Sequence, residues 1–243
     1  MPLKCLLSLY ALVLFWGTIA LFVFPSLLIY FIAYPLMKYP QDAFQHLSSV
    51  IYRIFFKLLF VADLRFDIPK EMPNGAIYIA THQSSLDYPI LGSFIKKYLT
   101  VTNLNFTKIP FASYVGRLIG ARALNKNSLG EIAYMYQELE DILNDGRNII
   151  IFPEGTRSQG DKLKRFRKGA FRLSMNTGKP IVPILIDGTA KILAKGDPCF
   201  KTLSKKRVYI KMFDPIYPKD FRNEQEMLRY SMELLEYKNN QSE

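Results

Sequence analysis

The chain is 243 residues long, which accommodates one globular domain of about 180 residues and an additional segment. It has 32 Lys and Arg residues against 21 Asp and Glu residues, so its net charge is +11 and its isoelectric point is close to 9.5. Such a basic surface attracts anionic phospholipid headgroups or nucleic acid. The sequence has no helix-turn-helix, zinc-finger or RNA-binding signature, which argues against nucleic acid as a partner.

The chain has two cysteines and two histidines. Cys5 and Cys199 lie far apart, and Cys5 falls in an uncharged N-terminal run. This argues against a disulfide framework and is typical of a reducing cytosol. Neither the cysteines nor His46 and His82 have the spacing of zinc ligands, so no metal site is expected.

The N-terminal run is the first element. Residues 5–37 contain no charged side chain between Lys4 and Lys38. A spanning helix needs about 20 residues, so this run is too long for one upright helix, and Pro25 interrupts it. Two arrangements fit: one span over residues 5–24 followed by a second apolar helix, or a helical hairpin embedded from one side. A cleaved signal peptide and a helix buried in a soluble core fit less well.

Residues 41–60 follow as an amphipathic helix. Apolar side chains recur at helical spacing and leave His46, Arg53 and Lys57 on the opposite side. This helix either lies on a membrane surface or packs against the domain, and both alternatives make His46 a surface residue.

The rest of the chain alternates between strand and helix patterns. Strands are expected at 76–80, 98–102, 148–152, 181–186 and 207–213, and helices at 128–144, 168–176 and about 221–237. Ser128 with Glu131 is a capping box, and Gly178 closes the helix that begins at Lys168. This alternation predicts an α/β fold with a mostly parallel sheet flanked by helices.

A histidine and an aspartate follow the strand at 76–80. His82 and Asp87 are separated by four residues, Gln83-Ser84-Ser85-Leu86. A neutral imidazole can take the proton of an alcohol during nucleophilic attack, and a carboxylate on its other nitrogen fixes the tautomer. In one alternative interpretation, His82 bonds to the backbone at a strand end. In another, which is compatible with catalysis, Asp87 caps the next helix, with Pro89 in its first turn.

A second motif, Phe152-Pro153-Glu154-Gly155-Thr156-Arg157-Ser158, follows the apolar strand at 148–152. Gly155 allows the backbone to turn closely around a ligand. Arg157 can bind a phosphate through two parallel hydrogen bonds, which lysine cannot do. Further basic residues follow, up to Lys168 and Arg172. They indicate either a solvated basic loop or a phosphate-binding site. Because both motifs follow strands, they are expected at the sheet edge where α/β proteins bind ligands.

The two motifs in this order resemble those of the glycerolipid acyltransferases, most closely the 1-acylglycerol-3-phosphate acyltransferases, over residues 65–215. The resemblance implies that His82 is the general base and Asp87 its partner. It implies that Arg157 contacts the glycerol phosphate, and that Glu154, Gly155 and Thr156 shape the phosphate pocket. Two weaker blocks add Lys108 and Arg122, and the basic stretch adds Lys168.

The resemblance also implies a reaction. A fatty acyl group would pass from acyl-CoA or acyl carrier protein to the sn-2 hydroxyl of 1-acylglycerol-3-phosphate (lysophosphatidic acid), giving phosphatidic acid, with no cofactor. The alternatives are the same chemistry on another lyso-lipid or an amino-acid-derived lipid, and a non-catalytic basic membrane-binding module.

The expected organisation is a membrane anchor at 1–40, a connecting helix at 41–60 and an acyltransferase domain at 61–243. The basic residues after the anchor place that domain on the cytoplasmic side of a phospholipid membrane.

Overall fold

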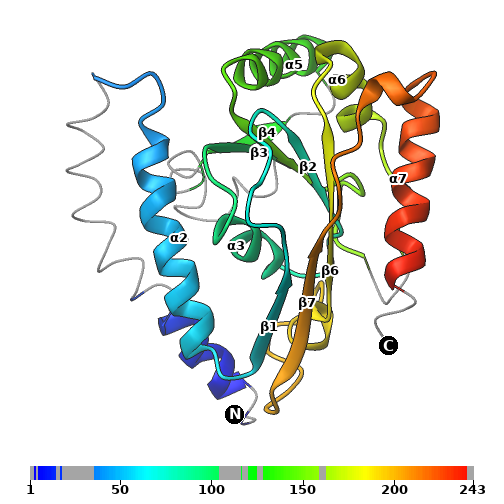
Figure 1. The fold of residues 1–243 in the computed structure, drawn as a ribbon. Helices are drawn as coiled ribbons and strands as arrows, with labels where there is room; N and C mark the ends of the chain where they lie inside the picture. Colours follow the sequence, from blue (N-terminus) through cyan, green and yellow to red (C-terminus); the bar gives the residue numbers. More distant parts are fainter. Residues whose placement is uncertain are drawn as a thin grey trace.

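The computed structural model describes residues 3, 5–14, 17, 36–103, 116, 120–124, 128–158 and 163–239. These residues form one sheet in the order β1-β7-β6-β2-β5-β3-β4, with helices on both faces (Figure 1). The strands are β1 (Ala62–Asp67), β2 (Ile77–Ala80), β3 (Tyr98–Asn103), β4 (Ala121–Leu124), β5 (Asn148–Ile151), β6 (Ile181–Asp187) and β7 (Lys206–Met212). The α/β fold expected from the sequence is confirmed.

The direction of the strands decides where the loops meet. The central strands β6, β2, β5, β3 and β4 are parallel neighbours, and β7 runs antiparallel to β6 and parallel to β1. The carboxyl ends of β2, β5 and β6 therefore lie at the same edge as the amino ends of β1 and β7. Both sequence motifs follow strands that end at this edge.

Alternate side chains of β2 serve two separate cores. Tyr78 and Ala80 belong to the core under α2 (Gln41–Leu58) and α3 (Asp87–Gly92). Ile77 and Ile79 belong to the core under α5 (Leu129–Asn144), α6 (Gly169–Thr177) and α7 (Glu224–Asn239). All four β2 residues are fully buried, which explains why this strand reads as a continuous apolar run rather than an alternating one.

The helix signals in the sequence are also confirmed. The Ser128 hydroxyl accepts a hydrogen bond from the Glu131 backbone N–H at 3.3 Å and caps α5. Gly178 ends α6 in the left-handed conformation, with a φ of 70°. Strand β1 was not expected, because it is an edge strand of mixed polarity, Ala-Asp-Leu-Arg-Phe-Asp, whose second half is exposed.

Helix α2 packs against the domain, one of the two alternatives for this segment. Phe44, Ile51 and Phe55 are buried, while His46 is exposed, as expected. At the start of the helix Asp42 forms a two-pronged ion pair with Arg147, which is buried. A buried guanidinium requires such a partner, so this pair fixes the entry of α2 onto the turn before β5.

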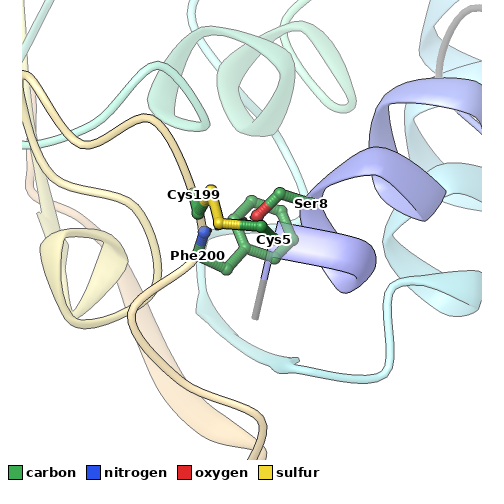
Figure 2. Close-up of a disulfide and its surroundings, with 4 residues drawn as sticks. All are labelled: Cys5, Ser8, Cys199 and Phe200. Carbon is green, nitrogen blue, oxygen red and sulfur yellow. Dashed lines mark hydrogen bonds between the residues drawn. A yellow bond between two sulfur atoms is a disulfide. The ribbon is translucent and has the colours of Figure 1, made fainter. Parts of the chain in front are cut away.

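The expectation that the cysteines stay unpaired is wrong. Cys5 and Cys199 form a disulfide with their Cα atoms 5.0 Å apart, and the Phe200 backbone N–H donates to the Ser8 hydroxyl at 2.5 Å beside it (Figure 2). The helical residues 5–14 fold back onto the domain, with Leu7 and Ala11 buried in the same core as Phe55 and Phe200. A separation of 194 residues in sequence did not reveal this proximity in space.

No helix among the described residues is both long enough and apolar enough to cross a membrane. Residues 15–16 and 18–35, which make up half of the predicted anchor at 1–40, lie outside the described residues.

The disulfide should stabilise the fold, because it closes a long loop and restricts the unfolded chain. We expect the double variant Cys5→Ser/Cys199→Ser to lose about 2–5 kcal/mol of stability and to melt at a lower temperature in thermal unfolding. The single variant Cys199→Ser should melt at the same temperature as the double variant. A double variant that melts at the wild-type temperature would show that the link contributes nothing.

Candidate active site

The site is assembled at the carboxyl ends of three adjacent parallel strands. His82 lies two residues beyond β2, Glu154 three residues beyond β5, and Thr189 two residues beyond β6. Because β2 lies between β5 and β6, the His82 turn is flanked on both sides by the loops of its neighbours. The edge of the sheet brings together residues that are more than 100 positions apart in sequence.

The first motif forms a buried hydrogen-bonded pair. His82 Nδ1 lies 2.9 Å from Asp87 Oδ2. The Asp87 side chain is completely buried, whereas the His82 side chain is 20% exposed. With Nδ1–H donating to the carboxylate, the imidazole keeps a lone pair on Nε2, which is the atom available to accept a proton.

The carboxylate is held by further donors. Asp87 Oδ2 also accepts from the backbone N–H groups of Gln83 at 2.7 Å and Ser84 at 2.8 Å. Asp87 Oδ1 accepts from the Thr189 hydroxyl at 2.7 Å. Asp87 is the first residue of α3 rather than its N-cap, which is Leu86, so the expected capping position is wrong by one residue. The carboxylate instead points back to the start of its own turn and orients His82.

The second motif is bonded directly to the first. The His82 backbone N–H donates to Glu154 Oε1 at 2.9 Å, and the His82 carbonyl accepts from the Ser158 backbone N–H at 2.7 Å. The imidazole stacks on the Phe152 ring, with centroids 4.0 Å apart. These contacts fix the backbone and the ring plane of His82, so the orientation of Nε2 is fixed as well.

Glu154 holds the turn together from inside. It is buried, and its other oxygen, Oε2, accepts from the Lys164 backbone N–H at 3.1 Å. Burial raises the pKa of the Glu154 carboxyl, while its two backbone donors act in the opposite direction. Both oxygens are engaged with the backbone, so Glu154 connects the two motifs and the basic segment that follows.

Gly155 has a positive φ of 70°, and a Cβ on this residue would lie 2.6 Å from Arg167 Nε. The arginine side chain could move aside, so it is the backbone conformation that favours glycine here.

Cations and hydroxyls line the turn that follows. Arg157 donates to the Ser85 hydroxyl at 2.8 Å, which places its guanidinium beside the His82 turn. The Thr156 hydroxyl accepts from Lys195 Nζ at 3.0 Å, and Lys164 Nζ donates to the Arg157 carbonyl at 2.9 Å. The two motifs thus place the His82 imidazole and a group of cations next to each other.

The other residues expected at the phosphate lie elsewhere or outside the described residues. Arg122 is on β4, three strands from β2, and pairs with Glu138 at 3.0 Å. Lys168 lies 3.7 Å from Glu224 at the start of α7. Lys108 lies outside the described residues.

Sequence reasoning missed the loop after β6. Thr189 and Lys195 belong to it, and Gln83 bonds to its first residues, accepting from the Gly188 backbone N–H at 3.2 Å. The only sequence signal was the apolar strand at 181–186, which predicted the position of the loop but not its contacts. Among the described residues, no cluster of His, Cys, Asp and Glu is arranged to hold a metal ion.

Comparison with known proteins identifies the class. The Acyltransferase family model matches residues 63–187, slightly more than half of the chain, and the chain belongs to this family. The match contains His82, Asp87 and the whole second motif.

Individual relatives are named 1-acyl-sn-glycerol-3-phosphate acyltransferases. A chloroplastic one from Brassica napus is 31% identical over 58% of this chain and 40% of its own length. One from Saccharomyces cerevisiae is 32% identical over 58% of this chain and 46% of its own length. One from Salmonella typhimurium is 27% identical over 69% and 68%. The chain therefore spans about two fifths of the plant relative and about half of the yeast one.

The fold is similar to a solved structure. The 1-acyl-sn-glycerophosphate (LPA) acyltransferase PlsC from Thermotoga maritima superposes with a TM-score of 0.76 at 24% identity, covering 96% of this chain and 95% of that one. This similarity supports the architecture described above.

Thr189 should matter for turnover because it completes the shell around Asp87. We expect Thr189→Val to leave Asp87 Oδ1 without its hydroxyl donor, lowering stability by about 1–3 kcal/mol and reducing kcat. Thr189→Ser keeps the hydroxyl and should retain both properties. Thermal unfolding and steady-state turnover of the two variants test this, and a fully active, fully stable Thr189→Val protein would contradict it.

Proposed function

We propose that the protein transfers a fatty acyl group from acyl-CoA or acyl carrier protein to the sn-2 hydroxyl of 1-acylglycerol-3-phosphate, giving phosphatidic acid for phospholipid synthesis. The observation that carries this proposal is the His82–Asp87 pair, bonded through Glu154 to a turn that presents Arg157. The names of the relatives support the same reaction.

The proposed chemistry is a single displacement. As the acceptor hydroxyl attacks the thioester carbonyl, its proton moves to His82 Nε2 and a C–O bond forms. The tetrahedral intermediate then collapses, the C–S bond breaks, and the thiolate leaves with the proton returned by His82. Asp87 keeps Nδ1 protonated throughout and stabilises the imidazolium. The thioester supplies the driving force, so the proposal needs no cofactor.

The acceptor is positioned by its phosphate. The phosphate of 1-acylglycerol-3-phosphate is only a few covalent bonds from the sn-2 hydroxyl, so its binding site must lie close to the base. Arg157 meets this requirement because its guanidinium contacts Ser85, three residues after His82. An arginine fork suits the phosphomonoester through two parallel hydrogen bonds.

Loss of the base should strongly reduce turnover without unfolding the protein. We expect His82→Ala and Asp87→Asn each to lower kcat by about 10²–10⁴, the usual contribution of general-base catalysis. The measurement uses purified protein, labelled acyl-CoA and a panel of lyso-acceptors, with thermal unfolding as the control for folding.

Three results would count against the proposed function. Near wild-type turnover of His82→Ala would remove the proposed base from the mechanism, and near wild-type turnover of Asp87→Asn would remove its proposed partner. Faster acylation of acceptors that lack a phosphomonoester would assign the chemistry to another lipid, and turnover of no acceptor would favour a non-catalytic membrane-binding role.

We further propose that the N-terminal run attaches the protein to a phospholipid membrane with the domain on the cytoplasmic side. The uncharged residues 5–37 and the basic residues after them support this orientation. Several described side chains of the segment, Leu6, Leu9, Tyr10, Leu12 and Val13, are exposed. Disulfides persist mainly in oxidising compartments, so on this side Cys5 and Cys199 would meet cellular reductants.

Hydrophobic attachment should resist salt. We expect the full-length protein to stay with membranes in a high-salt wash and to require detergent for release, because salt screens charges but does not weaken apolar burial. Membrane fractionation followed by immunoblotting measures this, with a salt-released peripheral protein as the control. Release by salt alone would rule out embedding of the run.

A further inference from the structure

The described cations include several that pair with a carboxylate and, beside His82, three that do not. Many are neutralised by a carboxylate: Arg122 by Glu138, Arg147 by Asp42, Lys168 and Arg172 by Glu224, and Lys201 by Asp197. Arg157, Lys164 and Lys195 are half-buried, and their recorded partners are uncharged oxygens: a hydroxyl, a carbonyl and a hydroxyl. Within the described part of the chain none of these three is within ion-pair distance of a carboxylate. Three half-buried cations without an anion leave a concentration of positive charge beside the base.

Lys195 comes from a different part of the fold than the other two. Arg157 and Lys164 follow β5, whereas Lys195 lies in the connection between β6 and β7. Its ammonium donates to the Thr156 hydroxyl at 3.0 Å, directly beside Arg157 in sequence. An ammonium has three N–H donors, so two remain for a ligand at this turn.

The connection that carries Lys195 is fastened at both ends. Near its start, the Thr189 hydroxyl donates to Asp87. Near its far end, Cys199 is bonded to Cys5, and the next backbone N–H donates to Ser8 (Figure 2). Between these points the Ala194 backbone N–H donates to Asp197 at 3.0 Å. Lys195 is therefore presented to the Thr156 turn by a braced loop rather than by a free tether.

We propose that Lys195 is a specificity-determining residue, whose ammonium joins Arg157 in binding the phosphomonoester of the acceptor lipid. The inference rests on the proposed function and extends it to a second cation. A phosphomonoester carries a charge of about −1.5 to −2 at pH 7, which two cations match. A phosphodiester carries a single charge and one fewer free oxygen, so it gains less from the second cation.

The position of Lys195 favours the acceptor over the donor as the source of this phosphate. The acceptor phosphate must lie near His82, as Thr156 and Arg157 do. The phosphates of coenzyme A are separated from the thioester by the whole pantetheine arm. Lysine acts here as a point charge that complements the planar arginine fork.

The test compares Lys195→Met and Lys195→Arg with the control Lys201→Met, which removes a cation of the same connection that already pairs with Asp197. The probes are two non-reacting lipids: the 2-deoxy analogue of 1-acylglycerol-3-phosphate, and its methyl phosphodiester. Binding to the full-length protein in detergent micelles is measured by titration calorimetry, and thermal unfolding verifies the fold. The KM values for acyl-CoA and for acyl-pantetheine, which lacks the coenzyme A phosphates, are measured in parallel.

We expect Lys195→Met to weaken binding of the monoester roughly tenfold to a hundredfold, the loss of one charge-assisted hydrogen bond, and binding of the diester by no more than about twofold. Lys195→Arg should restore most of the monoester affinity, and Lys201→Met should behave as wild type. Equal losses for both lipids, or a rise confined to the KM for acyl-CoA, would overturn the inference. The probes do not react, so their binding can be measured whether or not the protein is an enzyme. If the protein discriminates between the two probes but acylates no acceptor, the proposed reaction is wrong and the phosphate site stands.

Discussion

The burial of the Asp87 carboxylate is the constraint on which the rest of the site depends. A carboxylate taken out of water is costly unless donors replace its hydration. Here two backbone N–H groups of its own turn, the Thr189 hydroxyl from the loop after β6 and the imidazole of His82 surround it. The same contacts that compensate the buried charge also hold the His82 imidazole, so folding of the turn orients this ring at the same time.

The second motif acts on the same histidine from the other side. Glu154 accepts from the His82 backbone N–H, and Phe152 stacks on the His82 ring. The Ser158 backbone N–H donates to the His82 carbonyl. A turn with both faces fixed loses little entropy when a substrate binds, which is what preorganised catalysis requires. Arg157 and Lys195 border this turn, and their hydrogen-bond partners are the uncharged Ser85 and Thr156 hydroxyls.

Most of the sheet and the core of the site could be predicted from the sequence, because their signals are local. Buried parallel strands read as short apolar runs, and the two motifs directly follow such runs. The contacts that the sequence did not reveal join segments about 40 to nearly 200 residues apart: Thr189 to Asp87, Lys195 to Thr156 and Cys5 to Cys199. Arg122 was assigned by position in a motif alone, and a local carboxylate on α5 engages it instead. Edge strand β1 left no clear signal because its outer half is not buried.

One reversal in the sheet explains why these distant segments meet. Because β7 runs antiparallel to β6, the connection between them must turn back at the edge where β2 and β5 end, rather than cross to the other end as a parallel link would. That loop therefore passes the His82 turn, contributes Thr189 and Lys195, and reaches the helical residues 5–14 at Cys199. The amino-terminal segment and the site are thus joined by a single loop. The uncharged run therefore begins at the edge that carries His82, where Cys5 is bonded to Cys199. Lys38, directly after the run, pairs with Asp145 just before β5, at the opposite edge of the sheet.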